Sequence, residues 1–165
     1  MSQQIVIDSR VFAREARSLE GELPVAQLTR VLDTLADSAG VLKFRIEGRM
    51  NLERNRPQLL LQVSGVLSVC CQRCLEGVEY SLGINSLLEF VADENELTQE
   101  DIEDDSKDFL PAQSEVDVVA LIEDEIILDL PSAPRHESCA LPETGQDDGS
   151  SSPFAVLKGF KGKAS

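Results

Sequence analysis

The sequence has a single histidine, half as many basic as acidic residues, and no long apolar run among its 165 residues. One histidine leaves little of the usual machinery for general acid–base catalysis, and no Gly-x-Ser-x-Gly element, P-loop or dinucleotide-binding glycine motif is present. No apolar run approaches the ~18 residues that span a membrane. The first residues lack the basic, apolar and small-residue order of a secretory signal. We therefore expect neither an enzyme of the common classes nor a membrane or secreted protein.

The acidic residues are concentrated in one stretch of the chain. Residues 1–90 carry 10 basic and 11 acidic residues, residues 91–152 carry 2 and 19, and residues 153–165 carry 3 and none. The formal net charge of −15 argues against a broadly basic nucleic-acid-binding face, because phosphate binding depends on lysine and arginine. The densest part, residues 93–108, has two interpretations: a solvated acidic loop, or an acidic surface that meets a basic partner.

Hydrophobic periodicity predicts a helix followed by a sheet. Apolar residues from Leu28 to Leu35 recur at helical spacing, which predicts an amphipathic helix over residues 25–38. From residue 41 the period changes to two. The alternation returns over residues 59–69 and 78–90, which predicts sequential antiparallel strands in a meander. Gly65 interrupts one of these strands and is expected at a bulge or a close approach.

A second helix is predicted over residues 117–128, with Asp117 as its N-cap. The run IILDL within it is equally compatible with a strand. Asp124 and Glu125 flank the apolar stripe and are expected at a solvated helix edge.

These elements predict an α+β fold, an antiparallel meander packed by two helices. The predicted domain spans residues 1–139 and contains an acidic loop over residues 93–115. Residues 140–152 have the composition of a linker, and residues 153–165 are predicted to form a flexible apolar-basic tail.

Three of the four cysteines, Cys70, Cys71 and Cys74, lie between two predicted strands. Without a secretory signal a disulfide framework is not expected. The C-x-x-C pair Cys71 and Cys74 has three interpretations: half of a zinc site on a hairpin turn, a redox pair, or buried free thiols. A redox pair usually lies at a helix N-terminus near a βαβ unit, and the pattern predicts no such unit here.

The second half of a zinc site is available far along the chain. His136 and Cys139 follow two prolines with H-x-x-C spacing, so the predicted ligand set is Cys71, Cys74, His136 and Cys139. The alternative for His136 is a surface imidazole beside Arg135 and Glu137.

Three segments together give the chain a recognisable pattern: SVCCQRCLE (residues 68–76), VALIEDEIILDLPSAPRHESC (residues 119–139) and PFAVLKGFK (residues 153–161). They resemble the bacterial YceD family of large ribosomal RNA subunit accumulation proteins. The resemblance implies a cytoplasmic, non-enzymatic factor needed for normal accumulation or processing of 23S ribosomal RNA. Many family members carry further cysteines after the proline motif, which would complete a four-ligand site. His136 and Cys139 occupy that region here.

The implied partner is a large-subunit precursor, reached through ribosomal protein, 23S rRNA or both, with no membrane and no small-molecule substrate. Protein contact through the acidic segment is the preferred mechanism, and any RNA contact by the basic tail is secondary. Five tail residues are candidate partner contacts: Phe154, Leu157, Lys158, Phe160 and Lys161. The alternative for the tail is a loose chain end. The alternatives for the function of the whole protein are a zinc-stabilised interaction module without a ribosomal role and a thiol redox protein.

Overall fold

The computed structural model describes residues 5–141 as three α-helices, seven strands and three short 3-10 helices. In chain order the α-helices and strands are β1 (Val6–Ile7), α1 (Ser9–Arg14), β2 (Ser18–Pro24), β3 (Val41–Asn51), β4 (Arg56–Cys70), β5 (Gly77–Val91), α2 (Gln99–Glu103), β6 (Asp108–Pro111), β7 (Val116–Asp117) and α3 (Val118–Asp129). The 3-10 helices are η1 (Val25–Gln27), η2 (Leu32–Thr34) and η3 (Glu94–Glu96).

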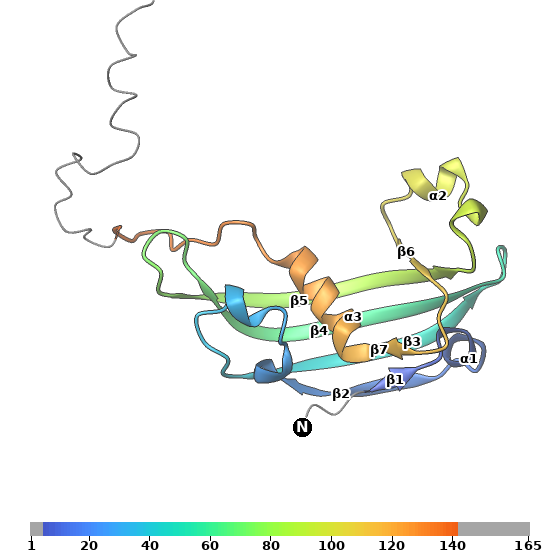
Figure 1. Ribbon diagram of the computed structural model, residues 1–165, viewed down its shortest axis with the longest axis horizontal. Helices are drawn as coiled ribbons and strands as arrows, with labels where there is room; N and C mark the ends of the chain where they lie inside the picture. The colour runs from blue at the N-terminus through green and yellow to red at the C-terminus, as the bar shows by residue number, and fades with distance from the viewer. Residues whose placement is uncertain (1–4, 142–165) are drawn as a thin grey trace, which may run out of the picture.

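The main sheet has five strands in the order β2-β3-β4-β5-β6. Its neighbours pair antiparallel except β5 and β6, which run parallel. A second sheet pairs the short β1 and β7. Figure 1 shows the β4–β5 turn at one end of the long strands, and α1, α2 and the β3–β4 turn at the other. The predicted α+β class and the antiparallel meander are confirmed.

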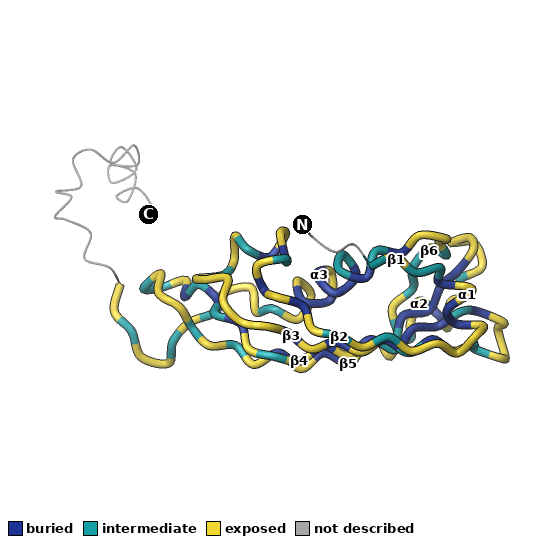
Figure 2. The backbone as a smooth tube through the Cα atoms, turned by 90° about the horizontal axis from the view of Figure 1, so that it is seen from below, coloured by how far each residue is buried: buried dark blue, intermediate teal, exposed yellow. Residues whose placement is uncertain are grey.

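One face of the sheet carries the core, and α3 covers it (Figure 2). The alternation in β3 buries Leu42, Phe44 and Ile46 because successive side chains of a strand point to opposite faces. From α3, Ile122 and Ile126 are fully buried in the same cluster. The predicted N-cap of this helix is confirmed, since the Asp117 carboxylate accepts from the first free N–H groups.

Two glycines mark places where segments pack without room for a side chain. A Cβ at Gly65 would lie 2.5 Å from Leu42 Cδ2, which confirms the predicted close approach. A Cβ at Gly48 would lie 2.4 Å from the carbonyl oxygen of Phe12. Helix α1 therefore lies directly against the backbone of β3.

Residues 25–38 do not form the predicted helix. They contain η1 and η2, two separate turns. The backbone N–H of Arg30 donates to the Glu123 carboxylate on α3 at 2.8 Å, a bond that takes the place of one within a helix. β-branched residues such as Val31 also have a low intrinsic helix propensity. Leu28 and Val31 are fully buried, so the pattern identified core residues and missed the backbone conformation.

The acidic segment is more ordered than the predicted loop over residues 93–115, because it contains η3, α2 and β6. Thr98 and Asp101 form a capping box at the start of α2. Asp101 is buried and pairs with Arg54 and Arg56 at 3.3 and 3.2 Å. The positive charges that pair with Asp101 therefore come from β4 and the turn before it, and these pairs attach the segment to the sheet.

The expected solvated edge of the second helix holds for Asp124 and is wrong for Glu125. Asp124 is exposed and pairs with Arg30 at 2.6 Å. Glu125 is buried against β5, where it accepts a hydrogen bond from the Ser86 hydroxyl. Burial raises the pKa of the Glu125 carboxyl.

Within residues 5–141, no helix is long and apolar enough to cross a membrane. The predicted tail and nearly all of the predicted linker lie outside the described residues.

Candidate functional site

The turn between β4 and β5 positions the C-x-x-C pair. The backbone N–H of Cys71 donates to the carbonyl of Glu76 at 2.8 Å, and the N–H of Leu75 donates to the carbonyl of Cys71 at 3.0 Å. Leu75 adopts a positive φ of 65°, which turns the chain back toward β5. The turn therefore holds Cys71 and Cys74 on one small loop.

The chain after α3 passes alongside this turn and brings in the second pair. The backbone N–H of Gln72 donates to the carbonyl of Pro134 at 2.8 Å, and the Arg73 guanidinium donates to the carbonyl of Cys139 at 3.4 Å. Arg73 thus bonds to backbone instead of being wholly solvated. These contacts join segments that are far apart in the sequence, since Arg73 and Cys139 are separated by 66 positions.

The four predicted ligands come together in space. Cys71 Sγ lies 3.7 Å from Cys139 Sγ, and Cys74 Sγ lies 3.3 Å from His136 Nδ1. All four ligand atoms lie within 4.8 Å of one another. Tetrahedral ligands at zinc, with about 2.3 Å to sulfur and about 2.0 Å to nitrogen, stand roughly 3.5–3.8 Å apart. The geometry suits a small cation that prefers sulfur and nitrogen.

His136 is oriented for ligation by its second ring nitrogen. Nε2 lies 3.0 Å from the carbonyl oxygen of Gly77. A carbonyl only accepts, so this hydrogen bond requires the proton on Nε2, and the neutral imidazole with that proton has its Nδ1 lone pair toward Cys74. A backbone carbonyl on the far nitrogen is the usual arrangement around a metal-bound imidazole. The alternative of a lone surface imidazole does not describe this residue.

The two hairpin thiols differ in acidity. The backbone N–H of Cys74 lowers the pKa of Cys71 to about 5, with the N–H of Arg73 acting in the same direction against burial. The N–H of Glu76 lowers the pKa of Cys74, but burial and the thiols of Cys71 and Cys139 outweigh it, so that pKa is raised. A bound cation would favour the thiolate form of both.

Two further observations limit the interpretations of the cysteines. Cys70 is not one of the four clustered residues, and its Sγ lies 3.6 Å from the carbonyl oxygen of Leu75. Cys71 and Cys74 lie on a turn between antiparallel strands and not at a helix N-terminus, the usual location of a redox pair. The arrangement favours metal ligation.

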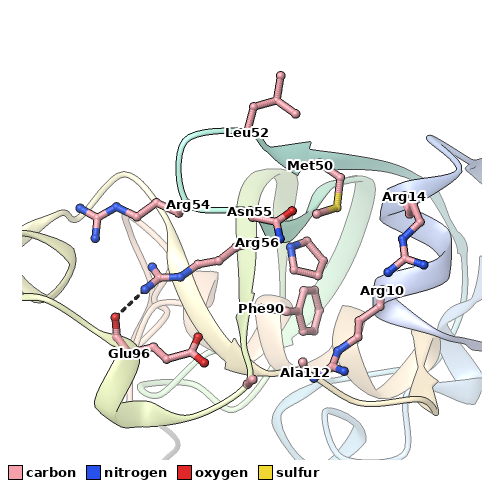
Figure 3. A pocket seen from close by; sticks show the side chains of 12 residues that line it. Arg10, Arg14, Met50, Leu52, Arg54, Asn55, Arg56, Phe90, Glu96 and Ala112 are labelled. Carbon is pink, nitrogen blue, oxygen red and sulfur yellow. Dashed lines mark hydrogen bonds between the residues drawn. The ribbon is translucent and has the colours of Figure 1, made fainter.

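A second feature, which the sequence reasoning missed, lies at the opposite end of the sheet. A cavity of about 560 Å³ opens between α1, the β3–β4 turn and the segment before α2. Figure 3 shows Arg10 and Arg14 on one side of this cavity and Phe90 at its centre. We call this cavity the arginine cleft. The two arginines lie one helical turn apart, and no acidic residue stands three or four positions from either. This unpaired spacing is the signal in the sequence that could have identified them.

The far wall of the arginine cleft is a buried ionic network. Arg56 pairs with Glu89 and Asp101, both at 3.2 Å, and donates to the carbonyl of Glu96 (Figure 3). Lys107 lies 3.6 Å from Glu89. Glu89 lies on the opposite face of β5 from the core, since strand side chains alternate. The network fastens the acidic segment to that face.

The predicted partner contacts of the tail, Phe154, Leu157, Lys158, Phe160 and Lys161, lie outside the described residues.

Comparison with known protein families gives one assignment. A family model described as large ribosomal RNA subunit accumulation protein YceD matches residues 59–161. This span holds both cysteine motifs, α3 and residues 153–161 of the predicted tail. No curated protein and no solved structure matches the chain. The family model covers more than half of the sequence, so the chain belongs to the YceD family.

Proposed function

From this family membership we propose that the protein is a non-enzymatic factor in biogenesis of the large ribosomal subunit. It would act in the cytoplasm and support the synthesis, processing or accumulation of 23S rRNA. The observation that carries this proposal is the family match over residues 59–161. The absence of common catalytic motifs in the sequence is consistent with it.

The proposed mechanism is contact with a basic protein of the large-subunit precursor. Exposed acids on and beside α2, among them Glu100, Glu103 and Asp105, form the contact surface. The ionic network beneath them holds this surface in place, which lowers the ordering cost on binding. The basic tail, residues 153–165, adds a secondary contact to RNA or protein.

The test follows 23S rRNA and large-subunit precursors in depleted cells on sucrose gradients. We expect depletion to lower 23S rRNA and large subunits, and the wild-type chain to restore both and to sediment with precursors. The triple variant E100Q/E103Q/D105N should sediment less with precursors. The matched control E20Q/E22Q/E79Q removes three exposed charges elsewhere and should behave as wild type.

Normal gradients in depleted cells would overturn the ribosomal role and leave an interaction module of another pathway. Equal sedimentation of the triple variant and its control would remove the acidic surface from the mechanism. Unchanged sedimentation after deletion of residues 153–165 would remove the tail.

We also propose that Cys71, Cys74, His136 and Cys139 hold a structural zinc ion. Support comes from their mutual distances, all within 4.8 Å, and from the oriented imidazole. Bound zinc would join the β4–β5 turn to the segment after α3. Metal analysis of the purified chain should give about one zinc per molecule.

C74S should lose that zinc, and C70S should keep it because Cys70 is not one of the four clustered residues. A metal-free chain whose Cys71 and Cys74 form a reversible disulfide under thiol trapping would favour the redox alternative instead.

A further inference from the structure

We propose that the arginine cleft binds one nucleotide of single-stranded RNA, with its phosphate on Arg10 and Arg14 and its base against the apolar wall. This proposal rests on the proposed function, since a factor that acts on ribosomal precursors meets RNA. It differs from that function in assigning direct RNA contact to a site in the folded domain.

Arg10 and Arg14 lack partners in a chain that is rich in acids. Among residues 5–141, neither guanidinium forms an ion pair or a side-chain hydrogen bond. Three other exposed arginines, Arg17, Arg30 and Arg45, each have a carboxylate within 2.8 Å. Two like charges one helical turn apart destabilise a helix. A bound anion would relieve this repulsion.

The backbone of helix α1, which carries both arginines, is anchored at the edge of the arginine cleft. The Asp8 carboxylate accepts from the N–H groups of Arg10 and Val11, both at 2.9 Å, and so caps the helix. Phe12 is buried, and its carbonyl packs on Gly48. The anchored backbone places two exposed guanidinium groups one helical turn apart, and together they can reach the several oxygens of a phosphate.

The wall beside the two arginines is apolar and shaped for a flat group. Met50 and Pro57 line it, and Phe90 forms its buried floor. Leu52 projects from the β3–β4 turn with 89% of its surface exposed, which is unusual for a leucine without a partner. Asn55 lies on the same turn and offers an amide that both donates and accepts. A base needs such an apolar surface for its faces and a polar group for its edge.

The remaining positive charges of the arginine cleft are already occupied. Arg56 is held by Glu89 and Asp101, and Arg54 pairs with Asp101 at 3.3 Å. The free charge therefore lies on the α1 side alone, next to the apolar wall. A phosphate joined to a flat base matches this two-part surface, whereas an acidic peptide has no such group beside each carboxylate. Duplex RNA keeps its bases stacked, so the cleft requires a single strand.

The experiment measures fluorescence anisotropy of a 3′-labelled single-stranded 12-mer RNA with the full chain. R10Q/R14Q should weaken binding by about tenfold or more and lower the magnitude of the log–log salt slope by about 0.7, the value for one phosphate neutralised on a single strand. The matched control R45Q/R30Q removes two exposed arginines elsewhere and should change affinity by less than about threefold. Circular dichroism checks that each variant is folded.

A second variant tests the site without touching α1. L52E places a carboxylate on an exposed position of the apolar wall, so it should leave the fold intact and weaken RNA binding. Equal affinity of wild type, R10Q/R14Q and L52E would overturn the proposal. If AMP competes as effectively as unlabelled RNA, the ligand is a free nucleotide, and the proposal that it is single-stranded RNA is overturned. Polyglutamate binding that depends on Arg10 and Arg14, with RNA binding that does not, would also overturn it.

Failure of this inference and failure of the proposed function are separable. If the wild-type chain sediments with large-subunit precursors and R10Q/R14Q binds RNA as tightly as wild type, the site proposal fails and the function stands. If R10Q/R14Q loses RNA binding but wild type does not sediment with precursors, the site stands and the ribosomal role fails.

Discussion

Each end of the main sheet contains a cluster of polar side chains, and the two clusters differ in the kind of groups that they bring together. At the β4–β5 turn, three thiols and an imidazole meet within 4.8 Å of one another. At the other end, Arg56 and Lys107 meet Glu89 and Asp101. The first cluster gathers four electron-pair donors, which the proposed cation would join. The second contains both signs of charge and is complete in itself.

The two ends should therefore depend on different things for their stability: the β4–β5 turn on a bound ligand, and the opposite end on its ion pairs. The cysteine end should lose cohesion when a chelator removes the ion, because binding free energy of a structural metal is folding free energy. At the arginine end, a chelator should leave the stability unchanged. Loss of any one buried partner should lower it, since a buried charge without its partner is costly. Variants at the two ends test whether this division holds.

The largest effect is expected for Arg56, the centre of the ionic network. R56M keeps a long side chain but removes the guanidinium that the buried Glu89 and Asp101 share. We expect the free energy of unfolding to fall by about 3–5 kcal/mol. Urea denaturation followed by circular dichroism measures this. R45M, at an exposed arginine, should cost less than about 1 kcal/mol, and equal losses in the two variants would show that the network contributes little.

The next largest effect is expected at the cysteine end. C74S in a zinc-loaded chain should lower the free energy of unfolding by about 2–4 kcal/mol, the stabilisation that a ligand gives at 100 to 1,000 times its dissociation constant. EDTA should lower wild type by the same amount and leave C74S unchanged. C70S serves as the control, because Cys70 lies outside the cluster. A wild-type chain insensitive to EDTA would break the comparison between the two ends.

The cysteine end was predictable from the sequence, and the arginine end was not. C-x-x-C and H-x-x-C are local spacings, and each confines two ligands to one short turn. The arginine cleft is assembled from α1, the β3–β4 turn and residues beyond β5, so no local pattern contains it. Residues 51–57 are polar and by themselves predict an exposed turn. The burial of Arg56 within them depends on Glu89 and Asp101, which come from distant parts of the chain.

The same distinction explains which elements the sequence predicted. The strands were predicted well because their period of two survives in β3, β4 and β5. Residues 25–38 have an equally clear helical period, yet a bond from the Arg30 N–H to Glu123 replaces the helical one. A tertiary contact of that kind overrides local propensity. Asp101 is predicted as solvated for the matching reason, since its arginine partners are distant in sequence.

Acid should loosen the arginine end through Asp101. The N–H of Thr98 lowers the pKa of this carboxyl to about 2, with further help from the Thr98 hydroxyl and Arg56 against burial. Because the folded pKa lies below the ordinary value of 3.8, the ionised form stabilises the fold above that value. The stabilisation should therefore be lost as pH falls from about 4 to about 2.

The D101N variant tests this dependence. It should be less stable than wild type at pH 7, by about 1–3 kcal/mol for a lost charged hydrogen bond, and the difference should shrink between pH 4 and 2. The exposed D105N serves as its control. A constant difference between D101N and wild type over that pH range would show that charge at Asp101 is not the source.

The smallest effect is expected for Glu100, the neighbour of Asp101 on α2. Its carboxylate lies 3.5 Å from Arg54, but the side chain is 89% exposed, so water screens the pair. E100Q should change the free energy of unfolding by less than about 0.5 kcal/mol in the same urea titration. A loss near that of D101N would mean that the acidic segment is held by its total charge. A negligible loss would locate the attachment in the buried carboxylate, and would leave the exposed acids of α2 free for a partner.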